Sequence, residues 1–460
     1  MKRIPLDPWI AARIGGPERL LQRDALQAWQ LARLRETVTI ARDKSRWYRR
    51  HLQNAPVEPR SLDDLTAFPF SSADDIRQEP MQLLCVSQDQ INRVVTLETS
   101  GTTGSPKRLY FTRDDQELTI DFFNVGMSTF TDPGDRVLIL LPCQTPGSVG
   151  DLLATALLRL GAIPIKHGVV SDPAVVVEIL QSERVDVVVG IPVQLLAMAR
   201  CQREPAPRLK SVLFATDYAS DAIRQLVQKT WHCEAYDHYG MTEMGLGGGV
   251  ECDARYGYHL READMLFEVI DPATGVAAPD GDYGEVVFTT LTRRGMPLIR
   301  YRTGDISRFI PGQCPCGSCL KRLDRITHRI NGVVVLTGQL AQSRVGDSDT
   351  QITMARLDEA VFSVAGVIDY SASMSRPGNL DHLQLDAQVS SSNFKQGAEK
   401  VRESLTVAVQ SVLRSNQNSA APVPCSIEVQ VIPFIAPLRR PAKRAIVDQR
   451  LAREFDQFPG

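Results

Sequence analysis

Short apolar runs alternate with amphipathic segments through the middle of this chain. Four of the runs predict buried strands: Val137–Leu141, Ile163–Ile165, Val185–Val189 and Ser211–Ala215. Apolar residues at helical spacing predict helices next to these strands, near residues 150–160, 173–183, 192–203 and 219–230. Strands and helices in this alternation predict a parallel sheet wrapped by helices, the α/β class.

The two ends of the chain have other patterns. Residues 18–53 carry Leu and Ala at helical spacing among Gln, Arg and Glu, which predicts helices. Turns rich in Pro, Gly and Asp separate three predicted strands of a smaller β subdomain: Phe267–Ile270, Gly284–Thr290 and Ile306–Ile310. After the basic segment Lys321–Arg329 the pattern predicts a last α+β unit, with helices at 355–364 and 394–414 and strands at 383–389 and 426–432.

Length and composition narrow the class of protein. At 460 residues the chain is long enough for two or three domains, and 43% apolar with 23% charged residues is typical of a soluble globular protein. A formal net charge of −2 gives no reason to expect a nucleic-acid partner. No apolar run approaches the roughly 18 residues of a membrane span, and residues 1–16 lack the apolar core of a signal peptide. Nine cysteines then fit free thiols or metal ligands in the cytoplasm.

Residues Thr99–Lys107 read T-S-G-T-T-G-S-P-K, directly after the apolar run Val94–Leu97. Glycine lets the backbone approach a ligand closely, hydroxyls and free N–H groups can line an anion site, and lysine supplies a charge for phosphate oxygens. The spacing differs from that of a Walker A loop. A plain polar loop is the alternative interpretation. The candidate phosphate ligands are Ser100, Gly101, Thr102, Thr103, Gly104 and Lys107.

Two further motifs follow, Tyr239–Glu243 (Y-G-M-T-E) and Tyr301–Asp305 (Y-R-T-G-D). Together with the first motif they resemble the nucleotide motifs of the adenylate-forming superfamily, which contains acyl- and aryl-CoA ligases, peptide-synthetase adenylation domains and luciferases. The resemblance implies a large N-terminal domain, residues 1–324, with helix-wrapped parallel sheets and a small β subdomain. It also implies a hinge, placed here at Asp324, and a small mobile α+β lid, residues 325–460.

The same resemblance implies roles for single residues in these motifs. Tyr239, followed by Gly240, would pack on the adenine of ATP, and Thr242 would contact the α-phosphate. Glu243 would hold Mg²⁺, a cation that takes carboxylate oxygens. Asp305 would accept hydrogen bonds from the ribose hydroxyls. The structural alternatives are a core aromatic residue for Tyr239, a surface acid for Glu243 and a turn-capping carboxylate for Asp305.

Looser matches extend the nucleotide site. Ala215, Thr216 and Asp217 occupy the place where related chains line the adenine pocket, although a plain loop explains them nearly as well. Arg322 belongs to a recognisable hinge motif and is placed with the nucleotide-binding residues. That motif departs from the related pattern at Arg325, where a second acid is expected.

A second cluster joins thiols and an imidazole. Cys314, Cys316 and Cys319 lie in one Gly/Pro-rich loop, and Cys252 and His259 precede them. Three thiolates and an imidazole make a tetrahedral zinc set. The pattern resembles the phenylacetate-CoA ligase branch of the superfamily, some members of which carry a structural zinc near this place. The predicted ligands are Cys252, His259, Cys314 and Cys316, with Cys319 in reserve, and metal-free thiols are the alternative.

The lid departs from its family pattern. Related chains carry a lysine there that pairs with the substrate carboxylate and the α-phosphate, whereas alignment places Pro441 at this position. Proline has no side-chain donor for that contact. Lys443 or Arg440 are the candidate substitutes, and Lys443 is included in the predicted catalytic set with Lys107, Thr242 and Glu243.

The predicted function is that of an ATP- and Mg²⁺-dependent acid–CoA ligase, which resembles phenylacetate-CoA ligases and forms an acyl-adenylate and then a thioester. Its partner is a small carboxylic acid, aryl or arylacetic, and a homodimer is left open. A first alternative keeps adenylation without CoA: AMP goes to a hydroxyl, as in the related coenzyme-F390 synthetases, or the acyl group goes to a carrier protein. A second alternative is a nucleotide-binding protein that does not turn over.

Overall fold

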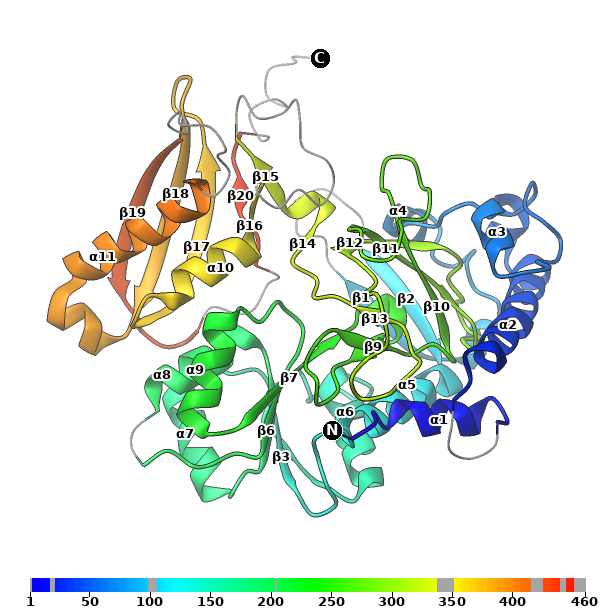
Figure 1. Cartoon of the computed structure of the whole chain (residues 1–460), viewed down its shortest axis with the longest axis horizontal. Helices are drawn as coiled ribbons and strands as arrows, with labels where there is room; N and C mark the ends of the chain where they lie inside the picture. Colours follow the sequence, from blue (N-terminus) through cyan, green and yellow to red (C-terminus); the bar gives the residue numbers. More distant parts are fainter. Residues whose placement is uncertain are drawn as a thin grey trace. The chain divides into compact units, whose positions relative to one another are not determined.

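The computed structural model describes residues 2–16, 21–97, 106–202, 205–336, 351–414, 425–438 and 444–450. The chain divides into two compact units (Figure 1). The first unit contains Met1–Gly168, Val187–Val189 and Tyr236–Arg325, and the second contains Val169–Asp186, Gly190–Ala235 and Ile326–Gly460. The second unit thus combines an internal stretch with the C-terminal residues, and the predicted domain boundary at residue 324 stays a prediction.

Helices of the first unit lie both within the stretches predicted from the sequence and outside them. They are α1 (Leu6–Arg13), α2 (Arg23–Lys44), α3 (Arg46–His51), α4 (Ala73–Gln78), α5 (Arg113–Met127) and α6 (Val149–Leu160), with the 3-10 helices η1 (Asp63–Ala67), η2 (Gln88–Gln90) and η3 (Thr242–Met244). The helices predicted within residues 18–53 and near 150–160 are confirmed. α1, α4 and α5 were not predicted.

Strands of the first unit form parallel and antiparallel ladders. They are β1 (Ile91–Leu97), β2 (Lys107–Thr112), β3 (Arg136–Ile139), β4 (Ile163–Lys166), β5 (Val187–Gly190), β7 (Glu234–Tyr239), β8 (Gly249–Val250), β9 (Tyr258–Leu260), β10 (Met265–Ile270), β11 (Gly284–Thr290), β12 (Tyr301–Ser307) and β13 (Arg322–Leu323). β3 pairs in parallel with β4 and β5. Antiparallel ladders join β1 to β2, β7 to β8, β9 and β13 in that order, and β10 to β11 and β12.

One strand prediction was wrong in its position. The third strand of the small β subdomain is Tyr301–Ser307, not Ile306–Ile310, and its ladder with β11 pairs Tyr301 with Phe288. The strand begins inside the Y-R-T-G-D motif, whose polar residues hide the apolar run expected of a strand. Tyr301, Thr303 and Asp305–Ser307 of β12 are nevertheless buried, and the hydroxyls of Tyr301, Thr303 and Ser307 all donate hydrogen bonds to other segments.

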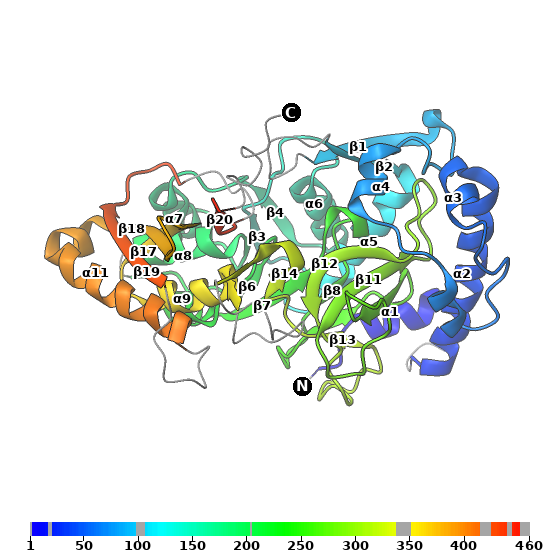
Figure 2. The same ribbon diagram turned by 90° about the horizontal axis from the view of Figure 1, so that it is seen from above.

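The second unit ends in a mixed sheet covered by helices. Its elements are α7 (Pro173–Ser182), α8 (Pro192–Cys201), β6 (Ser211–Phe214), α9 (Asp221–Trp231), β14 (His328–Arg329), η4 (Ile330–Gly332), β15 (Val333–Val335), β16 (Gln351–Thr353), α10 (Met354–Ser363), β17 (Val367–Ser375), β18 (Asp381–Val389), α11 (Ser391–Arg414), β19 (Cys425–Pro433) and β20 (Val447–Asp448). The sheet order is β19-β18-β17-β20, and α11 runs alongside it in Figure 2.

The C-terminal sheet is built from a clear period-two pattern. Along β18 every second residue is buried, including Leu383 and Leu385, and β18 pairs antiparallel with β17 and parallel with β19. The predicted α+β composition of this end of the chain is therefore confirmed, with its two helices and two strands within a few residues of their expected bounds. Among the described residues no helix is long and apolar enough to cross a membrane.

A capping carboxylate fixes the start of α5. Asp115 Oδ2 accepts the backbone N–H groups of Thr112 and Gly295, each at 3.0 Å, and Asp115 Oδ1 accepts the N–H of Arg294 at 2.8 Å. The capping box thus also anchors the loop before β12, because one side chain serves two segments.

Replacing this carboxylate should destabilise the fold. Asp115→Ala leaves three backbone donors without their acceptor, so we expect a loss of about 3 kcal/mol in the free energy of unfolding. Its exposed neighbour is the matched control: Asp114→Ala should change this free energy by no more than about 0.5 kcal/mol. Urea unfolding followed by circular dichroism measures both, and equal effects would contradict the role of Asp115.

Candidate active site and metal centre

A buried lysine–glutamate pair lies at the start of β2. Lys107 is the first residue of that strand, and its ammonium pairs with the Glu243 carboxylate. The Tyr301 hydroxyl, from the first residue of β12, donates to Glu243 Oε1 at 3.1 Å and lies 3.4 Å from Lys107 Nζ. The Lys107 and Glu243 side chains are only 12% and 3% exposed. Two opposite charges from distant parts of the chain therefore share one nearly dry site.

The chain around Glu243 holds this carboxylate in its charged form. Glu243 lies in η3, directly after β7, and Arg293 donates to its backbone oxygen at 2.7 Å. Burial would raise the pKa of Glu243, but the Lys107 ammonium outweighs burial and holds the pKa below its ordinary value. At neutral pH the carboxylate is therefore ionised and able to hold a cation.

Glu243 and Tyr301 join the segments Tyr239–Glu243 and Tyr301–Asp305, and Tyr239 and Asp305 form a second contact between them. The Tyr239 hydroxyl donates to Asp305 Oδ2 at 3.0 Å, and both residues are buried. The Tyr239 ring stacks with that of Tyr258, with 6.0 Å between ring centroids. Gly240 follows where a Cβ atom would lie 2.4 Å from the backbone oxygen of Leu246, so this position accepts only glycine.

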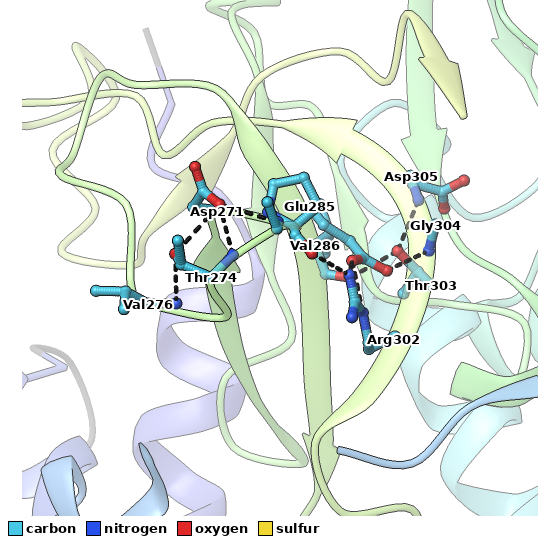
Figure 3. A network of polar contacts seen from close by, with 11 residues as sticks. Asp271, Thr274, Val276, Glu285, Val286, Arg302, Thr303, Gly304 and Asp305 are labelled. Carbon is cyan, nitrogen blue, oxygen red and sulfur yellow. Dashed lines mark hydrogen bonds and ion pairs between the residues drawn. The ribbon is translucent and has the colours of Figure 1, made fainter. Parts of the chain in front are cut away.

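The turn that carries Asp305 is held by a buried glutamate (Figure 3). Glu285 Oε1 accepts the Gly304 N–H at 3.0 Å, and Glu285 Oε2 accepts from Arg302 Nε at 2.7 Å. Thr303 Oγ1 donates to the Val286 oxygen at 2.6 Å and accepts the Asp305 N–H at 3.0 Å. In Figure 3 the Asp305 carboxylate points away from this network, which holds the turn through backbone N–H groups, while Oδ2 accepts from Tyr239.

The remaining predicted nucleotide residues lie on other elements. Thr242 is half-buried at the start of η3, beside Glu243. Ala215, Thr216 and Asp217 belong to the second unit, directly after β6, and Thr216 has a left-handed φ of 74°. Arg322, on β13, donates to the backbone oxygens of Tyr256 and Gly312 at 3.2 and 3.1 Å. Predicted residues that lie outside the described residues are Ser100, Gly101, Thr102, Thr103, Gly104, Arg440, Pro441 and Lys443.

The four predicted metal ligands converge in the first unit. Cys252, His259, Cys314 and Cys316 are buried, and their ligand atoms all lie within 4.8 Å of one another. Cys252 Sγ is 3.7 Å from Cys314 Sγ, and Cys316 Sγ is 3.5 Å from His259 Nε2. With Zn–S bonds of about 2.3 Å, two sulfurs of a tetrahedral site lie about 3.8 Å apart. The group therefore has the chemistry and the spacing that a zinc ion requires.

The reserve ligand is not part of this group. The Cys319 thiol donates to the backbone oxygen of Leu21 at 3.3 Å. Within the group, hydrogen bonds from Cys252 and His259 lower the pKa of Cys316 to about 3 against the effect of burial. Burial lowers the pKa of His259, but the neighbouring Cys314 and Cys316 outweigh it and raise that pKa to about 9. A metal ion would displace the remaining protons, because it binds thiolates and neutral imidazole.

Comparison with known proteins agrees with this geometry. The family model described as AMP-binding enzyme matches residues 25–291, more than half of the chain. The chain belongs to the AMP-binding enzyme family. The predicted recognition of the adenylate-forming superfamily is thus confirmed. This AMP-binding enzyme carries its Tyr239–Glu243 motif inside the matched residues and its Tyr301–Asp305 motif just beyond them.

The relatives identify the branch. Phenylacetate-coenzyme A ligase from Thermus thermophilus is 29% identical over 83% of this chain and 85% of the relative, and that from Aromatoleum evansii is 31% identical over 70% and 74%. A crystal structure of 2-hydroxyisobutyryl-CoA ligase in the postadenylation state has a TM-score of 0.77 at 23% identity, covering 94% of this chain and 91% of that one. The predicted branch and the α/β fold with a smaller C-terminal α+β part are therefore confirmed.

Two residues of the site had no role in the sequence analysis. Tyr301 stands in a recognised motif, but only its contact with Glu243 and Lys107 shows that its hydroxyl belongs to the charged site. Arg293 is fully surrounded, holds the Glu243 backbone and lies over the Phe111 ring at 4.3 Å. In the sequence Arg293 stands out only as an arginine shortly after the apolar strand Gly284–Thr290, and this pattern is too common to indicate a buried site residue.

Removing Lys107 should make the stability of this AMP-binding enzyme depend on pH. In Lys107→Met, burial acts on Glu243 without its cation, so its folded pKa rises above the unfolded value of about 4.3. The folded state then holds the proton more tightly than the unfolded state, and stability falls as pH rises above about 4.3. We expect a loss of about 3 kcal/mol at pH 8 and a smaller loss at pH 5, measured by urea unfolding.

A double variant tests whether the unpaired Glu243 carboxylate causes this pH dependence. Lys107→Met with Glu243→Gln carries neither charge of the pair, so its stability loss should be smaller and nearly independent of pH. A single Lys107→Met variant whose loss is the same at both pH values would contradict the pairing.

Proposed function

We propose that this AMP-binding enzyme activates a small carboxylic acid, of the aryl or arylacetic class, with ATP and then forms a CoA thioester. The named phenylacetate-CoA ligases support this activity, since the chain covers most of their length. The observation that carries the proposal is the pair of buried contacts: Lys107–Glu243 joins the first nucleotide motif to the second, and Tyr239–Asp305 joins the second to the third.

The proposed reaction has two steps. In the first, a carboxylate oxygen of the acid forms a bond to the α-phosphorus of ATP, the bond from that phosphorus to the bridging oxygen breaks, and pyrophosphate leaves. In the second, the CoA thiolate forms a bond to the acyl carbon, the bond to the AMP oxygen breaks, and AMP leaves. Both steps need positioned reactants and stabilised anionic oxygens more than covalent chemistry from the protein.

The residues divide this work. Lys107 would turn from Glu243 to the phosphate oxygens, because a charged donor is strongest when paired with an anion. Glu243 would hold Mg²⁺, which neutralises phosphate charge when bound. The exchange leaves neither buried charge without a counter-charge. Tyr239 would lie against the adenine, and Asp305 would accept from the ribose hydroxyls.

The other assignments complete the same proposal. The loop Ser100–Gly104 and Thr242 would contact the phosphates, Ala215–Asp217 would line the adenine, and Arg322 would support the hinge side of the nucleotide site. Residues 325–460 would act as the lid, in which Lys443 or Arg440 takes the place of the lysine missing at Pro441. A cytoplasmic location belongs to the proposal because the proposed metal site needs reduced thiols.

Pyrophosphate release tests the activity. The purified protein, ATP, Mg²⁺ and a panel of aryl, arylacetic and alkyl acids should release pyrophosphate with the preferred acid, and hydroxylamine should trap the adenylate as a hydroxamate. Glu243→Gln should lower this rate at least about 100-fold, because the site loses its anionic ligand. Glu117→Gln, an exposed glutamate on α5, is the matched control and should leave the rate unchanged.

Product analysis with and without CoA separates the alternatives. A thioester formed only when CoA is present supports the ligase. An AMP ester of an added alcohol, or acyl transfer to a carrier protein without CoA, would replace the second step. Tight ATP binding with no pyrophosphate from any acid of the panel would show a protein that binds nucleotide without turnover and would overturn the proposal.

The Cys/His group is assigned as a structural zinc site. Four protein ligands close the coordination shell, so such an ion takes no part in the reaction. Its place in the fold supports this role, because His259 lies on β9 directly after Tyr258, whose ring stacks on Tyr239. The ion would thus hold the strand behind the proposed adenine residue.

Metal analysis tests the assignment. Protein purified without chelator should contain about one zinc per chain, and Cys316→Ser should lower this content and the melting temperature. Cys319→Ser is the matched control from the same loop and should keep the full zinc content, because that thiol points to Leu21. A stably folded wild-type chain without metal would retire the zinc site while leaving the ligase proposal intact.

A further inference from the structure

The loop after β6 has a backbone conformation that its own residues disfavour. Residues 215–221 connect β6 to α9, and Thr216 within them has a φ of 74° and is exposed. A β-branched residue rarely adopts positive φ, and such strain persists only where surrounding contacts hold it. The contacts that hold this loop in its strained conformation therefore determine how it is presented to a ligand.

A carboxylate from the C-terminal residues supplies such contacts. Glu359, on α10, accepts the Tyr218 hydroxyl at 2.8 Å on Oε1. It also accepts the Asp221 backbone N–H at 2.9 Å on Oε1 and 3.0 Å on Oε2. Asp221 is the first residue of α9, where a backbone N–H that has no acceptor within the helix and the helix dipole favour an anion. One side chain thus holds the loop at its middle and at its end.

The helix that carries Glu359 is itself fixed within the second unit. Arg200, near the end of α8, donates to the backbone oxygens of Phe362 and Val364 at 2.8 and 3.1 Å. These carbonyls end α10 and have no partner within the helix. α10 also packs against α9, as Figure 1 shows. In this structure Glu359 is therefore presented from a helix whose end is held by α8, which gives its contacts with the loop a defined geometry.

A second charged contact lies on the neighbouring residue of α10. Asp358 accepts from Arg444 Nη1 at 2.5 Å and from the Tyr370 hydroxyl at 2.6 Å. Asp217 of the loop acts electrostatically on both Asp358 and Arg444. The loop therefore meets the C-terminal residues through hydrogen bonds at Glu359 and through charge at Asp217.

We propose that Glu359 is a positioning residue for ATP: it holds residues 215–221 in the strained conformation in which Ala215, Thr216 and Asp217 meet the adenine. This inference rests on the proposed assignment of those three residues to the adenine pocket. Its consequence is that the nucleotide site depends on a side chain from beyond residue 324. The loss of Glu359 then weakens ATP binding more than it slows the chemical step.

Steady-state kinetics of the full chain test this role. Glu359→Ala should raise KM for ATP about 10-fold, the effect of one lost charge-assisted hydrogen bond, with KM for the acid unchanged. Glu359→Gln should recover most of the affinity, because its amide oxygen still accepts the Asp221 N–H. Glu399→Ala, which removes an exposed glutamate of α11 paired only with its neighbour Arg402 among the described contacts, is the matched control and should leave KM for ATP unchanged.

A readout independent of turnover separates this inference from the proposed function. Hydrogen exchange of peptides spanning residues 215–231 should quicken in Glu359→Ala, and calorimetric titration with ATP should show the same weakening. If the wild type binds ATP but releases no pyrophosphate, the ligase proposal fails while the calorimetric comparison still decides the role of Glu359. Faster exchange with unchanged ATP affinity would overturn it, since Glu359 would then serve stability alone. Unchanged exchange and affinity would overturn it as well.

Discussion

A carboxylate removed from water must meet a cation, and this constraint organises the first unit. Glu243 is almost wholly buried and meets Lys107, so β2, η3 and the start of β12 have to converge on one point. Arg293 fixes the backbone at the same place, and the Tyr301 hydroxyl contacts both charged groups. The pair is charged and dry, which costs free energy unless both partners are present. Such a site is well suited to exchange its partners for a phosphate and a cation, because each ligand brings the charge that replaces the one lost.

The rest of the proposed nucleotide site is stiffened by contacts from behind. Glu285 holds the turn of Asp305, and the missing side chain at Gly240 lets two backbone segments pack closely beside Tyr239. The Cys/His group continues this support, since β9 carries both His259 and Tyr258, and β13 pairs with it at Arg322. The Arg322 guanidinium donates to the backbone oxygens of Tyr256 and Gly312, and in this way it supports the segments next to β9. Catalysis by positioning requires such a scaffold, because a displaced ligand loses the benefit of orientation.

In the second unit, too, a loop is held by side chains that lie far away in the sequence. The loop after β6 is strained at Thr216, and its restraint comes from α10, more than a hundred residues later. Arg200 and Arg444 tie α10 to its surroundings through backbone oxygens and a buried carboxylate. The Arg200 guanidinium satisfies carbonyl oxygens at the end of α10, and the Arg444 guanidinium pairs with the buried Asp358 carboxylate. The C-terminal residues therefore contribute to the order of the loop.

Local patterns in the sequence determined most of the elements, the three nucleotide motifs and the four members of the Cys/His group, because periodicity, glycine and ligand chemistry are properties of short segments. They misplaced the strand at Tyr301–Ser307, where polar motif residues obscure the period. They also gave no sign of the contacts that Tyr301, Arg293 and Glu359 make with distant parts of the chain. Only the tertiary structure decided these, since a buried charge or a free helix N–H is satisfied by whichever distant side chain the fold brings near. The tertiary structure likewise decided which thiols lie together: Cys314 and Cys316 lie with Cys252 and His259, whereas Cys319 donates to Leu21.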